Sequence, residues 1–523
     1  MKCSTPSTIL AVACLAVMAF VPTAWAADWP QWGGASGKNM AAGEKGLPDS
    51  FVPGEKDARG GTIKLETAKN VKWACKVCAT TFSTPVVAAG KVFLCGGGED
   101  KQGVIACLDE KTGKLLWRWQ GGNSPNGFGI CSTPFVDADR LYVVDLNCVV
   151  MCLDVNGQAD GPDRRKPRMI WSFDMQKQLK TFPADVYCGS CLLDGEMLYV
   201  PTSNGIDPFG PGAKERMFEL DKQFKGGRKI RADERAYRVP SPDAPNLVVF
   251  EKRTGRLLAV DDTLIAASLL KGQWSSCALG RIAGRNLVFY GGGDGVCYAF
   301  ESLRTLPTQP AKLKTAWSYD CNPAEYKEFG GMPRIVHYYH GDSRWGGTLN
   351  KNDGTYAGLA EIIGTPVVYR DCIYVAIGRD AAMGRGRGAL QCIDATKTGD
   401  ITRSGRLWTY QGLDWTSSTV SIADGLVYLA DAAGRLHCLD AETGRCCWIY
   451  EAHCGMLLGS TLVADGKVYM PSAKGLFIFA AGKEARLLNK VTVGAPIYSS
   501  PVAANGTLYI ASHKGWLWAA RVR

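Results

Sequence analysis

The sequence has few of the residues on which catalytic and metal sites most often depend. Only five of its 523 residues are histidines, and it contains no Gly-x-Ser-x-Gly elbow, His-Glu-x-x-His motif or phosphate-binding loop. Beyond the N-terminal segment, no stretch approaches the ~20 apolar residues that a membrane-spanning helix needs. The sequence therefore offers no support for hydrolase or kinase chemistry, and it predicts a mature chain without a transmembrane segment.

The chain also lacks a dominant charge and clear helical periodicity. Its 60 basic and 50 acidic residues are interspersed, and the formal net charge is +10. Nucleic-acid-binding proteins concentrate basic residues on one face, so we expect no nucleic-acid partner. Glycine, in contrast, is abundant at 61 residues. Many glycines and few helical stretches predict an all-β protein, in which strands are joined by turns.

The N-terminus has the pattern of an export signal. An apolar run at 9–21 is followed by Ala24-Trp25-Ala26, which is a small-x-small cleavage site. We expect residues 1–26 to be a signal peptide and the mature chain to start at Ala27, in the periplasm or outside the cell. Lipid anchoring through Cys14 is an alternative, but the apolar run continues past that cysteine.

The rest of the chain repeats one pattern of four strands. STPVVAAGKVFL with ACLDEKTGKLLW, and STVSIADGLVYL with HCLDAETGRCCW, are two clear copies. Such repeats predict a β-propeller of eight four-stranded antiparallel blades over 71–523, preceded by an extension at 27–70. The last copy has no fourth, outer strand, whereas residues 71–77 have the pattern of an outer strand without the three strands that should precede it. We therefore expect this N-terminal strand to complete the C-terminal blade. The copies open at Ser83, Ser132, Ser190, Ser276, Thr365, Thr419, Ser460 and Ser500.

These repeats resemble a known family. VYLADAAGRLHCLDAETG is similar to the PQQ-binding-like (quinoprotein alcohol dehydrogenase-like) β-propeller repeat, and ADWPQWGG is similar to the opening of exported bacterial members. The resemblance implies a propeller but leaves function open, because the family includes dehydrogenases, an outer-membrane assembly lipoprotein and propellers of unknown role. We expect a binding or scaffold protein of the cell envelope. The alternatives are a PQQ- and calcium-dependent dehydrogenase that oxidises alcohols or sugars, and a protein that binds or cleaves carbohydrate.

The long connections all fall on one face of the predicted propeller, at 120–130, 204–246, 320–363 and 379–388. Long loops on a rigid scaffold commonly carry function, so we expect an envelope protein or a small molecule to bind this face of a monomer. The channel mouth there should be ringed by the residues that open the innermost strands: Phe82, Cys131, Cys188, Trp274, Ile363, Ser417, Leu458 and Tyr498. The candidate ligand-binding residues are Phe82, Trp274, Tyr498, Asn204, Asp207, Asp294, Arg379 and Asp380; no catalytic residue or metal ligand is predicted.

Most of the repeated aromatic and cysteine residues are expected to pack rather than to react. Six tryptophans end outer strands and should pack between blades: Trp73, Trp117, Trp171, Trp317, Trp408 and Trp448. Four cysteines share one repeat position, which indicates small buried residues: Cys107, Cys152, Cys392 and Cys438. Cys131 and Cys188 are the candidate disulfide pair, because they open neighbouring innermost strands. Cys446 and Cys447 lie on an outer strand, where they cannot support a ligand at the mouth.

The histidines divide into two groups. His337 and His340 fall in a long loop of the candidate functional face, where they could serve catalysis or metal binding. His437 falls in a repeat strand and is expected to be structural.

Overall fold

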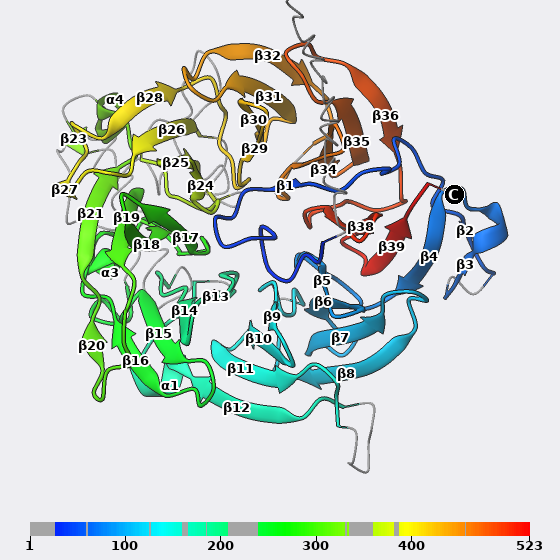
Figure 1. Ribbon diagram of the computed structural model, residues 1–523, viewed down its shortest axis with the longest axis horizontal. Coiled ribbons are helices and arrows are strands. Elements are labelled where there is room, and N and C mark those ends of the chain that lie inside the picture. Colours follow the sequence, from blue (N-terminus) through cyan, green and yellow to red (C-terminus); the bar gives the residue numbers. More distant parts are fainter. Residues whose placement is uncertain are drawn as a thin grey trace, which may run out of the picture.

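The computed structural model describes residues 27–58, 61–124, 127–158, 166–184, 186–207, 239–329, 332–333, 359–380, 386–455 and 457–522. Within these residues, eight antiparallel sheets with four-stranded cores are arranged in a ring (Figure 1). Each sheet starts near the centre of the ring and adds its strands outward. The predicted eight-bladed β-propeller is therefore confirmed.

The blades are numbered here in chain order. Blade 1 contains β5 (Val86–Ala88), β6 (Lys91–Gly97), β7 (Gly103–Asp109) and β8 (Leu115–Gly121), and blade 2 contains β9 (Phe135–Asp137), β10 (Arg140–Val144), β11 (Val149–Asp154) and β12 (Met169–Asp174). Blade 3 contains β13 (Leu192–Asp194), β14 (Met197–Pro201), β15 (Leu247–Glu251) and β16 (Leu257–Val260), and blade 4 contains β17 (Ala278–Ile282), β18 (Arg285–Gly291), β19 (Val296–Glu301) and β21 (Thr315–Asp320).

Blade 5 contains β24 (Val367–Tyr369), β25 (Cys372–Ile377), β26 (Ala389–Asp394) and β28 (Arg406–Tyr410), and blade 6 contains β29 (Ser421–Ala423), β30 (Leu426–Ala430), β31 (Arg435–Asp440) and β32 (Cys446–Glu451). Blade 7 contains β33 (Leu462–Ala464), β34 (Lys467–Ser472), β35 (Gly475–Ala480) and β36 (Leu487–Val491). Blade 8 contains β37 (Val502–Ala504), β38 (Thr507–Ala511), β39 (Trp516–Ala520) and, as its outer strand, β4 (Val71–Lys76).

Short elements extend or connect the blades. β1 (Ala41–Ala42) pairs in parallel with β33, β20 (Ala311–Lys312) with β16, and β27 (Gly399–Asp400) with β21. Two small hairpins consist of β2 (Glu55–Lys56) with β3 (Ile63–Lys64), and of β22 (Glu328–Phe329) with β23 (Met332–Pro333). The short helices are α1 (Met175–Leu179), α3 (Ile265–Ser268), α4 (Ala324–Lys327) and the 3-10 turn η1 (Leu65–Thr67). None of the helices described is long and apolar enough to cross a membrane.

The first and second strands of every blade are joined by a two-residue turn. Five of these turns have positive φ at both residues, as in Asp424 (49°) and Gly425 (73°). This backbone twist matches the twist of the flanking strands, which is why the turns AlaGly, AspGly and AsnGly recur. The turns define one face of the propeller, which we call the short-turn face. The opposite face carries the longer connections and is called the long-loop face.

The outer-strand tryptophans join neighbouring blades, as predicted. Each indole Nε1 donates to a backbone carbonyl of the next blade: Trp73 to Glu110, Trp117 to Val155, Trp171 to Lys252, Trp317 to Ala395, Trp408 to Ala441 and Trp448 to Gly482, at 2.9–3.2 Å. The four cysteines of the shared repeat position lie directly opposite such tryptophans, for example Cys107 opposite Trp117. A small side chain at this position leaves room for the indole.

A second set of bonds joins the blades at the centre. It involves one buried Ser or Thr before each innermost strand, a set we call the hydroxyl belt: Thr84, Thr133, Ser190, Ser276, Thr365, Thr419, Ser460 and Ser500. In seven of the eight steps around the ring, the backbone N–H of one member donates to the hydroxyl oxygen of the next, at 2.8–3.2 Å. In the sequence alignment, the first two copies open at Ser83 and Ser132, one residue before the belt residues Thr84 and Thr133. The alignment does not distinguish the two positions, because a Ser and a Thr stand side by side in both copies.

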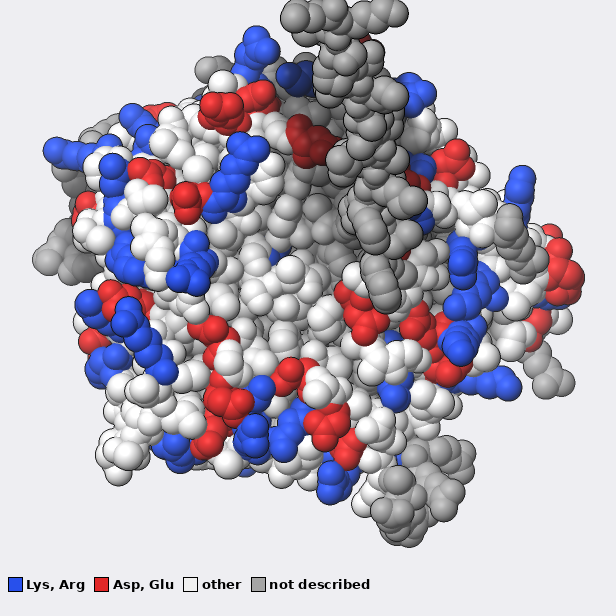
Figure 2. All heavy atoms as spheres, in the orientation of Figure 1, with Lys and Arg blue, Asp and Glu red and all other residues white. Residues whose placement is uncertain are grey.

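Residues 27–47, which we call the strap, close the centre of the short-turn face. Hydrogen bonds connect the strap to the innermost strands or turns of seven blades, from Trp29 with Val87 in blade 1 to Glu44 with Gly506 in blade 8. In Figure 1 this blue segment crosses the middle of the ring. Figure 2 shows charged side chains of both signs towards the rim of the same view, while the described atoms near its centre are mostly uncharged.

Candidate functional site

The predicted ring of mouth residues lies two positions before the hydroxyl belt, towards the long-loop face. Seven of its eight members are half-buried, although the residues around them are mostly buried, and Cys131 is buried. These seven side chains are thus partly exposed in an otherwise buried stretch. Cys131 has a thiol that lies 3.9 Å from the Gly129 carbonyl oxygen, so the Cys131–Cys188 disulfide considered from the sequence is not formed.

Blades 8 and 1 contribute an aromatic cluster to this mouth. Phe82 and Tyr498 stack with ring centroids 5.7 Å apart and planes 5° apart. His513, in the turn between β38 and β39, lies 4.7 Å from Phe82 and 5.1 Å from Tyr498. Phe128 meets Phe82 edge-on at 5.3 Å, and 39% of Phe128 is exposed. Sequence reasoning identified Phe82 and Tyr498 but missed Phe128 and His513, because those two belong to connections whose lengths differ between blades.

Trp274 lies on blade 4, four blades away from Tyr498 around the ring, and belongs to a charged cluster. The Lys271 ammonium is 5.6 Å from the centroid of the Trp274 ring and forms an ion pair with Asp380. The Trp274 indole donates to the Ala184 carbonyl oxygen at 3.3 Å, and the Asp380 N–H donates to Glu361 at 2.9 Å. The sequence predicted Trp274 and Asp380 but not Lys271, which is 3% exposed. Two residues predicted separately are thus linked through a buried lysine.

The other predicted residues are not part of this side-chain cluster, although two adjoin it: Arg379 directly precedes Asp380, and the Asn204 carbonyl oxygen accepts from the side chain of Gln273, the residue before Trp274. Arg379 is 1% exposed, so it is not on the surface of its loop. Asn204 is buried; its side-chain oxygen accepts from Phe182 N–H and its amide donates to the Ser241 carbonyl oxygen, both at 2.9 Å. Asp207 is half-buried at the end of a described segment. His337, His340 and most of the two large insertions lie outside the described residues.

Asp294 lies in the turn between β18 and β19 of blade 4. Burial raises its pKa to about 6, although hydrogen bonds from the Tyr298 hydroxyl (2.7 Å) and the Val296 N–H (3.1 Å) oppose this shift. Both carboxylate oxygens are therefore used within the turn. The sequence found this residue through its glycine-rich turn, but its observed contacts are local to the blade.

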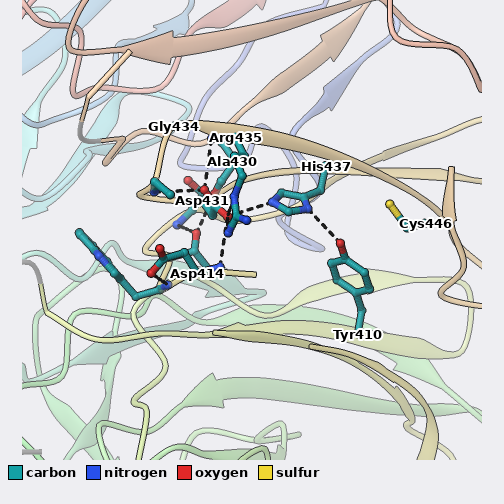
Figure 3. Close-up of polar contacts among 12 residues, drawn as sticks. Tyr410, Asp414, Ala430, Asp431, Gly434, Arg435, His437 and Cys446 are labelled. Atoms are coloured by element: carbon teal, nitrogen blue, oxygen red, sulfur yellow. Dashed lines mark hydrogen bonds and ion pairs between the residues drawn. The ribbon is translucent and has the colours of Figure 1, made fainter. Parts of the chain in front are cut away.

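A polar network joins blades 5 and 6 near the long-loop face (Figure 3). One carboxylate oxygen of Asp431 accepts from Arg435 at 2.6 Å, from His437 Nε2 at 2.9 Å and from the Asp414 N–H at 3.1 Å. The other ring nitrogen of His437 lies 3.1 Å from the Tyr410 hydroxyl. Burial by itself raises the pKa of Asp431, but the hydrogen bonds and charges of His437 and Arg435 outweigh burial and lower it.

His437 has no exposed surface in this network, and both of its ring nitrogens are engaged. These contacts support a structural role, as its place in a repeat strand indicated. Cys446 and Cys447 are both half-buried on β32, the outermost strand of blade 6. Two residues on the rim of the propeller cannot contact a ligand at the channel mouth.

Among the described residues, the predicted oxygen-bearing side chains do not converge on a calcium site of the kind that a PQQ-dependent dehydrogenase requires. Calcium binds six to eight converging oxygen atoms. Within the described ranges, no group of three or more His, Cys, Asp or Glu side chains is placed to hold a metal ion. The predicted oxygen-bearing side chains serve separate partners, namely Ser241 for Asn204, Tyr298 for Asp294 and Lys271 for Asp380.

Comparison of the sequence with known proteins gives one family and one curated relative. A family model described as outer membrane protein assembly factor BamB matches residues 24–262 and 334–450. The outer membrane protein assembly factor BamB of Burkholderia pseudomallei (strain K96243) is 29% identical over 113 residues, which are 21% of this chain and 29% of that protein. The match thus spans less than a third of the curated relative.

Solved structures with a similar fold include BamB and quinoprotein dehydrogenases. BamB from Moraxella catarrhalis matches with a TM-score of 0.52 at 11% identity, over 86% of this chain and 99% of that one. The quinohemoprotein alcohol dehydrogenase ADHIIG from Pseudomonas putida HK5 has a TM-score of 0.56 at 11% identity, over 95% and 80%. A europium-containing methanol dehydrogenase has a TM-score of 0.54 at 11% identity, over 93% and 89%. At such identities the similarity establishes the shared propeller fold alone.

Proposed function

The chain belongs to the family of the outer membrane protein assembly factor BamB, and from this we propose that it is a binding or scaffold protein of the cell envelope, exported to the periplasm or out of the cell. Its partner would be another envelope protein, bound at the long-loop face. The observation that carries the proposal is the difference between the two ends of the channel. The strap covers the short-turn end, whereas the long-loop end presents half-buried aromatic side chains.

The aromatic cluster is suited to a protein partner. Phe82, Tyr498 and His513 form a packed base, and Phe128 stands beside them with 39% of its surface exposed. Interfaces depend on a few aromatic anchors that become fully desolvated on binding. An apolar side chain of the partner placed on this cluster would bury Phe128 and exclude water from the stacked pair.

Site-specific photocrosslinking tests this proposal. A photoreactive phenylalanine analogue would replace Phe128 in the full-length chain, expressed in cells that naturally produce it. The matched control carries the analogue at Leu487, which is 38% exposed on the outer strand β36. We expect a defined crosslink to an envelope protein from position 128, reduced at least about tenfold by Tyr498→Ala, and no such product from position 487. Equal crosslinking from both positions would contradict a specific site at the mouth.

A thermal melt separates this proposal from the dehydrogenase alternative. A ligand at ~100 times its dissociation constant adds roughly 2.7 kcal/mol to the free energy of unfolding. PQQ with calcium should leave the melting temperature of the chain unchanged if the scaffold proposal is right. A clear rise that disappears in Trp274→Ala would instead establish PQQ binding and overturn it.

A further inference from the structure

The first described residue of the strap contacts a buried carboxylate. The Ala27 N–H donates to Glu44 Oε1 at 2.8 Å, and the other oxygen of the same carboxylate accepts from the Gly506 N–H at 2.6 Å. Glu44 is 6% exposed, and Gly506 lies in the turn between β37 and β38 of blade 8. One buried carboxylate therefore connects the start of the strap to the last blade of the ring.

The next residue connects the strap to both blades at the point where the ring closes. Asp28 accepts from the Ala89 N–H of blade 1 at 3.0 Å through one oxygen, and from the Asn505 amide of blade 8 at 2.9 Å through the other. Trp29 then pairs with Val87 in the innermost strand of blade 1. Blades 8 and 1 are neighbours in the ring but come from opposite ends of the propeller sequence. Residues 27–29 thus bridge the boundary between these two blades.

The Ala27 nitrogen would change its chemistry if the chain were cleaved just before it. Hydrolysis adds water across the Ala26–Ala27 peptide bond: the carbonyl carbon of Ala26 gains the oxygen and becomes a carboxylate, and the Ala27 nitrogen becomes an α-ammonium. A neutral amide with one hydrogen is thereby replaced by a cation with three donors. Hydrogen bonds between charged partners are shorter and roughly twice as strong as those between neutral ones.

We infer that cleavage between Ala26 and Ala27, by an endopeptidase that recognises small residues on the N-terminal side of the bond, completes the closure of the propeller. The new α-ammonium of Ala27 forms an ion pair with Glu44, and this pair fixes the strap across the boundary between blades 8 and 1. Glu44 is thereby assigned a role in stabilising the processed chain. The position of the cleavage matches the Ala24-Trp25-Ala26 motif, but the ion pair rests on the contacts of Ala27 and Glu44 alone.

The first experiment determines where the chain starts after export. The full 523-residue chain is expressed in a bacterium with its own N-terminus, and the intact mass and N-terminal sequence of the exported product are measured. We expect a single product that begins at Ala27. A product that begins at any other residue would overturn the inference, because no α-ammonium would then lie beside Glu44.

The second experiment measures the ion pair itself. Two forms of the mature chain are compared, one with a free amine at Ala27 and one acetylated there, each with Glu44 intact and as Glu44→Gln. We expect the free amine to raise the melting temperature by on the order of 1–2 °C, because exposure of Ala27 weakens the pair, and we expect this difference to vanish in Glu44→Gln. Glu66→Gln, an exposed carboxylate of the same N-terminal region, is the matched control and should preserve the difference. A difference that persists in Glu44→Gln, or is absent from the unsubstituted chain, would contradict the ion pair.

Discussion

Lys38 places an amine in the interior of the propeller. Its side chain has no exposed surface, and its nitrogen donates to Gln31 Oε1 at 2.6 Å and to the Trp32 carbonyl oxygen at 3.1 Å. Burial lowers the pKa of Lys38 from 10.5 to about 7, and the thiols of Cys277 and Cys191, which precede the innermost strands of blades 4 and 3, partly oppose this shift. The strap thus carries a group that titrates near neutral pH.

This burial predicts a pH-dependent stability. The folded-state pKa of Lys38 lies below its unfolded value, so between about pH 7 and 10.5 the unfolded chain binds the extra proton, and stability rises with pH in that interval. Lys38→Met removes the titration. We expect the substitution to raise the free energy of unfolding by about one to a few kcal/mol near pH 6, and the gain to shrink towards pH 10. Urea titrations of both proteins across this range measure the difference, and a gain independent of pH would show that Lys38 is not titrating.

At the scale of residues, the sequence is informative at the positions that the repeat itself specifies. Aligned copies show that Phe82 and Tyr498 occupy the same position of neighbouring blades, so their stacking follows from the fold. Lys38 and Lys271 have no such signal, because a lysine that is buried by a loop or by the strap looks in sequence like any exposed lysine. The sequence also predicted oxygen-bearing residues near the mouth, but whether their side chains converge depends on loop paths that spacing does not determine.

At the scale of elements, the hydroxyl belt joins the eight sheets across seven of their eight boundaries. Ser460→Ala, in blade 7, removes the oxygen that accepts from the buried Thr419 N–H of blade 6. An unsatisfied buried donor costs about 1–3 kcal/mol. We expect a loss of this size in urea unfolding and faster hydrogen exchange of the Thr419 amide. Ser404→Ala, on an exposed turn, is the control and should change stability by less than about 0.5 kcal/mol.

The regular strands could be predicted from sequence, whereas the short parallel additions could not. Alternating apolar residues, two-residue turns and terminal tryptophans recur in each copy, so they specify four strands per blade. β1, β20 and β27 have two residues each and no periodicity, and their pairing depends on where a loop passes a sheet edge. The path of the strap across seven blades was unpredictable for the same reason, because it belongs to no repeat.

At the scale of the molecule, β4 holds the last blade together. It pairs along β39 from Val71 with Ala520 to Lys76 with Trp516, and the Trp73 indole continues to blade 1. A chain that starts at Ala79 lacks both β4 and the strap, and we expect it to lose cooperative thermal unfolding and to aggregate through the open edge of β39. A chain that starts at Pro48 keeps β4, and we expect it to unfold cooperatively at a lower temperature than the mature chain. Circular dichroism melts with size-exclusion chromatography measure both, and a cooperative melt of the shorter chain would disprove the role of β4.

The pairing of β4 with β39 also determines when the molecule can finish folding. The strand that completes the last blade is synthesised near the beginning of the chain, about 440 residues before its partner. Until β39 has been made, β4 has no partner, so the ring cannot close and keeps an unpaired edge at each end. A prematurely terminated chain could never close, so its exposed edges would mark it for proteolysis.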